Sequence, residues 1–151
     1  MKIMFICAGN TCRSAMAKAI FEKILDEKNI KNIEVYSSGI YAEDGDVPAI
    51  YAIETMKEMN IDITKHRATN IKKSKIEEMD IILCSTLSQK SMVTQMYPNL
   101  KNNIFTIKEY ANKENVNGDF DVKDPWGYDL TIYRKCANEL KKHLKKIVYN
   151  L

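Results

Sequence analysis

Short apolar runs alternate with longer amphipathic segments, and this alternation constrains the fold more than any other feature of the sequence. Residues 3–6 and 79–84 consist mostly of consecutive apolar side chains, which is typical of strands buried on both faces of a parallel sheet. The pattern predicts two further strands at residues 33–37 and 103–107, and helices at residues 14–28, 48–60, 87–97 and 128–149. Parallel strands need crossover helices, so we predict a single-domain α/β protein: a three-layer sandwich with a central four-stranded parallel sheet and helices on both faces. Residues 111–127 are predicted to be irregular because of Asn112, Asn115, Asn117, Gly118 and Pro125.

The composition fits one domain spanning residues 1–151 and excludes several classes of protein. Hydrophobic residues make up 45% and charged residues 28%, both near the averages for globular proteins. No apolar run approaches the ~20 residues that cross a bilayer, so no membrane partner is expected. The net charge of +3 is too small and too dispersed to indicate nucleic-acid binding. The apolar stretch at the N-terminus is too short for a secretory signal, which predicts a cytoplasmic protein.

The cysteines and histidines do not form a metal-binding pattern. The chain has four cysteines, without a C-x-x-C pair, and its two histidines, His66 and His143, are far apart in the sequence. Zinc sites use closely spaced cysteine and histidine ligands. We therefore expect free thiols in a reducing compartment, and neither a metal nor a cofactor.

The segment after the first predicted strand combines several features of an anion site. It reads Cys7, Ala8, Gly9, Asn10, Thr11, Cys12, Arg13, Ser14. Gly9 and Asn10 tolerate positive φ, so the backbone N–H groups can curl inward. The helix N-terminus that follows and the Arg13 guanidinium add positive charge. Residues 8–14 are thus predicted to form a phosphate-binding loop after strand 1.

A cysteine at the start of such a loop is suited to nucleophilic catalysis. The positive surroundings would stabilise the Cys7 thiolate, which could attack phosphorus and form a cysteinyl-phosphate. Ser14 either caps the following helix or donates a hydrogen bond to the sulfur. The alternative is that Cys7 only ends a buried strand and that Asn10 and Thr11 only cap a helix.

A second signal lies 117 positions further along the chain, at Asp124-Pro125-Trp126-Gly127. Hydrolysis through a phosphocysteine needs a general acid for the leaving group and then a base for water, and one carboxylate can do both. Pro125 would fix the backbone beside Asp124, and Trp126 could form an apolar wall next to the substrate. The alternative is an ordinary surface turn.

Together these segments resemble the low-molecular-weight protein tyrosine phosphatases over the whole chain. Residues 36–39 (Tyr-Ser-Ser-Gly) and 65–68 (Lys-His-Arg-Ala) also match that family. The resemblance implies Cys7 as nucleophile, Arg13 as phosphate clamp and Asp124 as general acid. It implies a loop-supporting network of Asn10, Ser14, Ser37 and His66. Substrates would be phosphorylated proteins, with inorganic phosphate or another oxyanion as product or inhibitor.

Thr11 is where the sequence departs from the tyrosine-specific members, which usually carry a branched aliphatic residue there. In this respect the chain resembles the bacterial branch described as protein-arginine phosphatases. A threonine hydroxyl can accept a guanidinium N–H and Asp124 can hold others, whereas unpaired buried polar groups cost about 1–3 kcal/mol each. Trp126 would flank either substrate, and Gly127 after it favours the same branch. We expect a phosphoarginine hydrolase, with phosphotyrosine hydrolysis as the alternative.

Three other roles fit parts of the sequence. An arsenate reductase needs further cysteines after a central strand; Cys84 is so placed, but Ser91 stands where a second cysteine is expected. A phosphocarrier domain also has a phosphocysteine but needs neither Arg13 nor a remote acid. A disulfide between Cys7 and Cys12 could protect the nucleophile from over-oxidation; alternatively, Cys12 is a small packed residue at the helix entrance.

Overall fold

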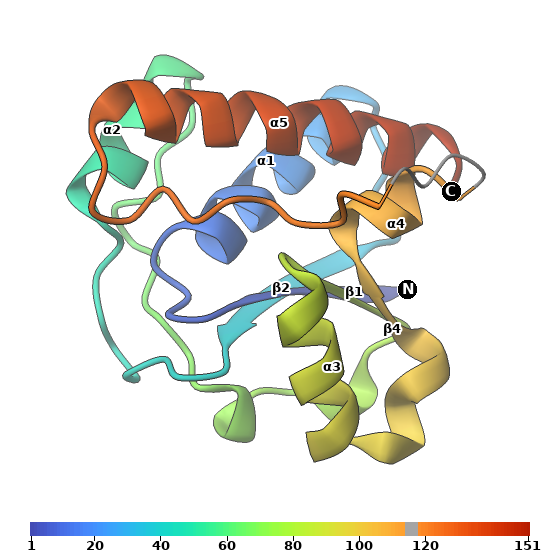
Figure 1. Cartoon of the computed structure of the whole chain (residues 1–151). Coiled ribbons are helices and arrows are strands. Elements are labelled where there is room, and N and C mark those ends of the chain that lie inside the picture. Colours follow the sequence, from blue (N-terminus) through green and yellow to red (C-terminus); the bar gives the residue numbers. More distant parts are fainter. Residues whose placement is uncertain (114–117) are drawn as a thin grey trace.

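Four parallel strands form the centre of the protein (Figure 1). This computed structural model describes residues 1–113 and 118–151. The strands are β1 (Lys2–Cys7), β2 (Glu34–Gly39), β3 (Ile81–Cys84) and β4 (Ile104–Thr106). Their order is β2-β1-β3-β4, and every pairing is parallel. The chain runs from β1 to β2 on one side and then returns to β3 on the other. The carboxyl end of β1 is therefore a topological switch point, where such sheets bind ligands.

Helices cover both faces of the sheet, as predicted. The helices are α1 (Arg13–Glu27), α2 (Ile50–Glu58), α3 (Leu87–Met96), α4 (Ile107–Ala111) and α5 (Leu130–Tyr149). In Figure 1, α1, α2 and α5 lie on one side of the sheet and α3 lies on the other. The fold class predicted from the sequence is confirmed.

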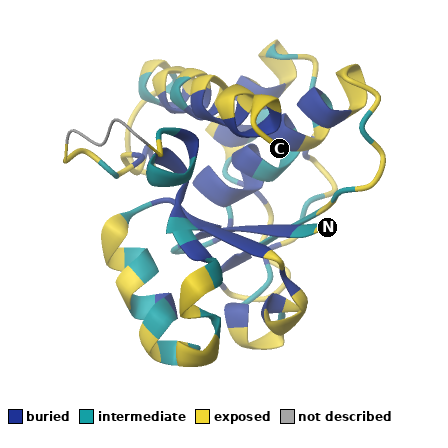
Figure 2. Ribbon diagram, turned by 90° about the vertical axis from the view of Figure 1, so that its right-hand side faces the viewer, coloured by how far each residue is buried: buried dark blue, intermediate teal, exposed yellow. Residues whose placement is uncertain are grey.

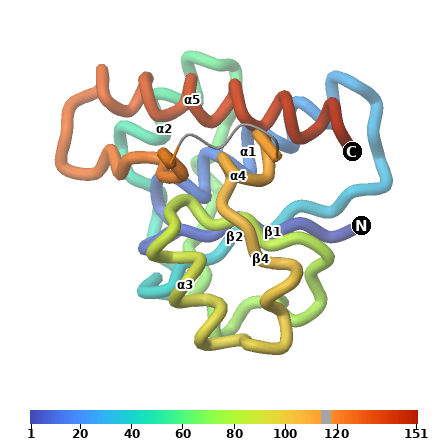
Figure 3. Tube along the Cα trace, turned by 45° about the vertical axis from the view of Figure 1, so that its right-hand side comes forward, coloured from blue at the N-terminus to red at the C-terminus, as the bar shows by residue number. Residues whose placement is uncertain are grey.

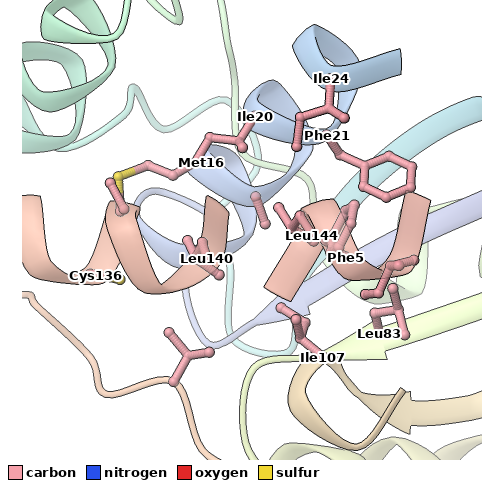
Figure 4. Close-up of a cluster of buried hydrophobic side chains, with 14 of the residues drawn as sticks. Phe5, Met16, Ile20, Phe21, Ile24, Leu83, Ile107, Cys136, Leu140 and Leu144 are labelled. Carbon is pink, nitrogen blue, oxygen red and sulfur yellow. The ribbon is translucent and has the colours of Figure 1, made fainter. Parts of the chain in front are cut away.

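The strand residues divide between two apolar clusters according to the alternation of side chains along a strand. Ile3 and Phe5 of β1 face the layer formed by α1 and α5, whereas Met4 and Ile6 face α3. The first layer is drawn in Figure 4, where side chains of α1 and α5 meet those of β1 and β3. Phe5 and Phe21 pack edge to face in this layer, with ring centroids 5.4 Å apart. The centre of the sheet is buried in Figure 2, which explains why the strand sequences lack polar alternation.

Several element boundaries differ from the prediction. Strand β2 continues to Gly39, and α2 and α5 begin two residues later than predicted. The segment at residues 103–107 is shorter as a strand, because Thr106 and Glu109 form a capping box that starts α4 at Ile107. Asp129 caps α5 by accepting a hydrogen bond from the backbone N–H of Ile132.

Helix α4 and three short 3-10 helices (Ile71–Lys73, Ile76–Glu78 and Pro98–Asn103) were not predicted. Residues 118–127 contain no helix or strand, in agreement with the irregular segment predicted there. Asn115 and Asn117, which helped to predict that segment, lie outside the described residues. Across the described part of the chain, none of the helices has the length and apolarity needed to cross a bilayer.

The chain termini and the switch point lie at opposite sides of the molecule. Figures 1 and 3 show both termini near the amino end of β1, whereas the loop after β1 lies at the other side. The part of the chain from residue 118 to residue 129 runs alongside α5 towards that loop. It thereby carries Asp124 from the far side of the molecule to the carboxyl ends of the strands.

Candidate active site

The loop after β1 curls around the sulfur of Cys7. The backbone N–H of Asn10 donates to Cys7 Sγ at 3.2 Å, and Ser14 Oγ lies 2.9 Å from the same sulfur. Asn10 has φ 58°, in the left-handed region, and makes the turn, whereas Gly9 is not among the residues with positive φ. Hydrogen bonds directed at a sulfur favour its anionic form. The loop therefore directs the Asn10 N–H and the Ser14 hydroxyl at the sulfur of Cys7.

A network behind the loop holds it in this shape. Asn10 is fully buried; its Nδ2 donates to Ser14 Oγ at 2.8 Å, and its Oδ1 accepts the backbone N–H of Thr69 at 3.0 Å. Because Ser14 Oγ accepts from Asn10, its own proton is free for Cys7 or for the Ser38 carbonyl at 3.4 Å. Of the two roles predicted for Ser14, the structure thus favours the bond to sulfur; the helix N-cap is Cys12, without a side-chain capping bond.

His66 supports the loop as predicted, and Ser37 does not. His66 Nε2 donates to the Asn10 carbonyl oxygen at 2.7 Å. Burial lowers the pKa of His66, and the bond to that carbonyl opposes the shift only in part. Ser37 lies on β2 opposite Phe5 and makes no hydrogen bond to the loop within the described residues; the adjacent Ser38 carbonyl takes that place. The contact from Thr69 was not predicted at all.

Gly39, at the end of β2, lies directly against the backbone of the loop. The Tyr41 backbone N–H donates to the Ala8 carbonyl at 2.9 Å, so the two chain segments are in direct contact. A Cβ at Gly39 would stand 2.6 Å from the Ala8 oxygen and 2.9 Å from the Asn10 nitrogen. Only glycine fits this approach, which is a constraint that sequence reasoning missed.

The Arg13 side chain is buried beside the sulfur and is held at its far end. One terminal nitrogen donates to the Val122 carbonyl at 3.0 Å, and the other lies 3.5 Å from Asp124 Oδ2. Its Nε has no hydrogen-bond partner among the described residues, although it is buried. Buried guanidinium donors are normally satisfied, so this N–H is available to an acceptor in the adjacent cavity.

That cavity has a volume of about 230 Å³ and contains most of the predicted site residues. It is lined by Cys7, Ala8, Gly9, Thr11, Cys12, Arg13, Asp124 and Trp126. The Asp124 side chain is half exposed, and its Oδ1 accepts the Trp126 backbone N–H at 3.1 Å. The indole of Trp126 is 69% exposed and forms an outer wall. A thiol, a cation and a carboxylate thus meet in one pocket at the switch point.

Comparison with known proteins identifies the family. A family model described as low molecular weight phosphotyrosine protein phosphatase matches residues 2–151. The chain belongs to this family. It is therefore a phosphatase, and the resemblance predicted from its motifs is confirmed.

Three similar proteins illustrate the relationship. A protein-arginine-phosphatase of Geobacillus stearothermophilus is 32% identical over 150 residues, which cover 99% of this chain and 95% of the relative. The solved structure of a low molecular weight protein tyrosine phosphatase from T. tengcongensis is 36% identical, with a TM-score of 0.90 and coverage of 100% and 99%. A YwlE arginine phosphatase mutant with a phosphorylated active-site serine is 30% identical, with a TM-score of 0.92 and coverage of 100% and 95%.

In this phosphatase the second loop cysteine is held away from solvent by α5. Cys12 is buried, and its Sγ lies 3.3 Å from the Tyr133 hydroxyl. Burial raises the pKa of the Cys12 thiol, so it resists ionisation. Both Cys7 and Cys12 are free thiols in this structure, and a disulfide between them stays a prediction.

The remaining cysteines are placed as core residues. Cys84 and Cys136 are buried, and burial raises the pKa of both thiols, that of Cys136 to about 12. A resolving cysteine needs access and thiolate character, which Cys84 lacks. Within residues 1–113 and 118–151, no three His, Cys, Asp or Glu side chains are grouped as they would be to hold a metal ion.

Proposed function

We propose that this phosphatase removes phosphate from phosphoarginine residues of proteins, with phosphotyrosine as the second candidate substrate. The observation that supports the chemistry is the buried, unpartnered Nε of Arg13, a residue that lines the same cavity as Cys7. A donor in that position suits an equatorial oxygen of a phosphoryl group. We also place the enzyme in the cytoplasm, because the mechanism requires a reduced Cys7.

In the proposed reaction Cys7 attacks phosphorus in line with the leaving group. Arg13 and the N–H groups of residues 8–14 hold the equatorial oxygens and stabilise the charge of the transition state. The S–P bond forms as the P–N or P–O bond breaks, and Asp124 gives its proton to the leaving atom. Asp124 then removes a proton from water, which attacks the cysteinyl-phosphate and releases inorganic phosphate and the Cys7 thiolate.

Covalent chemistry at this position agrees with a related protein. The YwlE mutant structure described above holds a phosphoryl group on an active-site serine. We infer a comparable intermediate on Cys7. Replacing the sulfur with a hydroxyl, as in Cys7→Ser, should abolish turnover on p-nitrophenyl phosphate while phosphate still binds. A Cys7→Ser enzyme with substantial turnover would exclude the covalent route.

Thr11 is the residue that favours phosphoarginine over phosphotyrosine as the substrate in this proposal. It lines the cavity together with Asp124. Among the described residues, the hydrogen-bond partner of Thr11 Oγ1 is the weakly interacting Cys12 Sγ, at 3.8 Å. That hydroxyl can therefore accept an N–H from a substrate guanidinium. The exposed indole of Trp126 offers a flat face to either a guanidinium or a phenyl ring, so it supports both substrates.

The test is the ratio of kcat/KM on phosphoarginine and phosphotyrosine peptides of the same sequence. We expect the native enzyme to prefer phosphoarginine, and Thr11→Ile to lower the ratio by about 10-fold or more, since an unpaired N–H costs about 1–3 kcal/mol. Thr11→Ser keeps the hydroxyl and serves as the matched control. Preference of the native enzyme for phosphotyrosine would overturn the assignment, and an unchanged ratio in Thr11→Ile would show that Thr11 does not select the substrate.

A further inference from the structure

A buried lysine on α4 makes contacts that the proposed chemistry does not use directly. The side chain of Lys108 is only 9% exposed. Its Nζ lies 3.2 Å from Asp119 Oδ2 and 3.3 Å from Glu139 Oε2. Lysine is rarely this buried without a paired charge, and loss of one partner of such a pair is costly. The contact to Lys108 is the largest cause of a lowered pKa at Asp119.

This ion cluster joins three parts of the chain at one point. Lys108 belongs to α4, Glu139 to α5, and Asp119 to the irregular segment that runs alongside α5 in Figures 1 and 3. Asp119 precedes Asp124 by only five positions. The cluster therefore connects the segment that precedes the proposed general acid to two helices, α4 and α5.

The segment has other anchors: the Val122 side chain is buried in the apolar cluster that also contains Tyr133 and Leu140 of α5, and hydrogen bonds hold the backbone on the other side. Asp121 Oδ1 accepts the backbone N–H of Leu87 at 2.8 Å, and the Val122 N–H donates to the Ser85 carbonyl at 2.8 Å. The Val122 carbonyl accepts from Arg13 at 3.0 Å. These bonds fix residues 121–122 to α3, to the end of β3 and to Arg13.

Around Val122 the segment also borders a hollow. A cavity of about 430 Å³ is lined by Arg13, Thr86, Lys108, Asp119, Asp121, Val122, Lys123, Asp124 and Glu139. All of these residues except Val122 carry polar or charged side chains. Across this hollow, the Lys108 cluster connects the segment to α5, and Asp124 itself is half exposed with one long contact to Arg13.

We propose that Lys108 is a positioning residue that sets the place of the Asp124 carboxylate over the cavity. The inference rests on the proposed role of Asp124 as general acid. Without the cluster, the segment loses its ionic attachment to α5 at Asp119, five residues before Asp124, and the carboxylate is displaced from its place in line with the leaving atom. Misplacement of a catalytic group by about 1 Å can cost as much as 100-fold in rate.

The experiment compares Lys108→Met, which keeps the length of the side chain and removes its charge, with the native enzyme on aryl phosphates. A phenolate leaving group needs protonation, whereas p-nitrophenolate is a weak base and needs little help. We expect Lys108→Met to lower kcat/KM about 10-fold for phenyl phosphate and by less than about threefold for p-nitrophenyl phosphate. A purely structural loss would lower both values equally.

Lys90→Met is the matched control. Lys90 forms an ion pair with Glu109, also on α4, at 2.6 Å, and it touches neither Asp119 nor Glu139. The Lys90→Met variant should have a lower unfolding temperature but the native ratio of kcat/KM for the two aryl phosphates. Asp119→Asn breaks the same cluster from the exposed side, so it provides the test if Lys108→Met fails to fold.

Asp124→Asn separates this inference from the proposed function. The positioning role is supported by two results together. Asp124→Asn lowers kcat/KM more for phenyl phosphate than for p-nitrophenyl phosphate, and adding Lys108→Met to Asp124→Asn lowers neither value further. If Lys108→Met and Asp119→Asn leave the substrate ratio at the native value, the positioning role is wrong, whereas Asp124 keeps its role. If Asp124→Asn itself leaves the ratio unchanged, the general acid is elsewhere and both statements are wrong.

Discussion

Replacing Gly39 with alanine tests whether the loop geometry, rather than the residue types alone, makes the active site. The new Cβ would stand 2.6 Å from the Ala8 carbonyl oxygen and 2.9 Å from the Asn10 nitrogen, where ordinary contact begins at 3.4 Å. Both atoms belong to the backbone, so no flexible side chain can move aside. The loop must therefore shift by several tenths of an ångström relative to β2.

The expected magnitude follows from that shift. The overlap with the Ala8 oxygen is about 0.8 Å, close to the displacement of ~1 Å that can cost 100-fold in catalysis. Overpacking of this kind typically costs about 1–3 kcal/mol in the free energy of unfolding. We therefore expect Gly39→Ala to fold, to bind phosphate weakly, and to lose about 10- to 100-fold in kcat/KM.

The assay combines kcat/KM on p-nitrophenyl phosphate, the inhibition constant of phosphate, and the midpoint of urea unfolding. Gly45→Ala is the control: Gly45 has φ +89°, so alanine there is strained, but nothing lies within 4 Å of the added Cβ. That variant should lose about 1–3 kcal/mol of stability and keep its activity. Gly39→Ala with the activity and phosphate affinity of Gly45→Ala would refute the argument that the end of β2 shapes the loop.

Other predictions concern the loop, the core and the response to pH. Asn10→Gly keeps the left-handed turn but loses the side-chain bonds, so the free energy of unfolding measured in urea should fall by about 1–3 kcal/mol. Phe21→Ala, at a fully buried site against Phe5, should cost about 3–5 kcal/mol in the same measurement. Burial, followed by the charge of Lys108, lowers the pKa of His143 from 6.5 to about 4, so the unfolded chain binds protons more readily in that range. Stability should therefore be fully present above about pH 6.5 and fall as the pH drops towards 4; in His143→Leu that part of the pH dependence, followed by thermal unfolding, should disappear.

The strands and the loop after β1 could be predicted because their signals are local. A run of apolar residues reports burial on both faces, and the residue types from Cys7 to Ser14 report a curled loop at a helix N-terminus. The same reasoning noted that both Gly9 and Asn10 tolerate positive φ, but only Asn10 adopts it. Glycine permits positive φ without requiring it, so its presence does not decide the backbone conformation.

Ser37 shows the limit of such reasoning. The motif predicted that the Ser37 side chain, on β2, supports the loop. Neighbouring residues of a strand point their side chains to opposite faces of the sheet, so a shift of one residue changes which atoms reach the loop. The loop is supported by the backbone carbonyl of Ser38 instead, and by the N–H of Thr69. Both contacts come from backbone groups, so the residue types at positions 38 and 69 could not have predicted them.

The sequence by itself determined the fold class and singled out the Cys7 thiol, the Arg13 cation and the Asp124 carboxylate, because each depends on periodicity or on the chemistry of a side chain. Only the tertiary structure decided how Asp124 comes to line the same cavity as Cys7, since the segment before it is held by contacts of Asp119 and Val122 with distant parts of the chain. Such contacts arise when separate elements pack together. Their partners are chosen by the geometry of the whole fold and leave no local pattern.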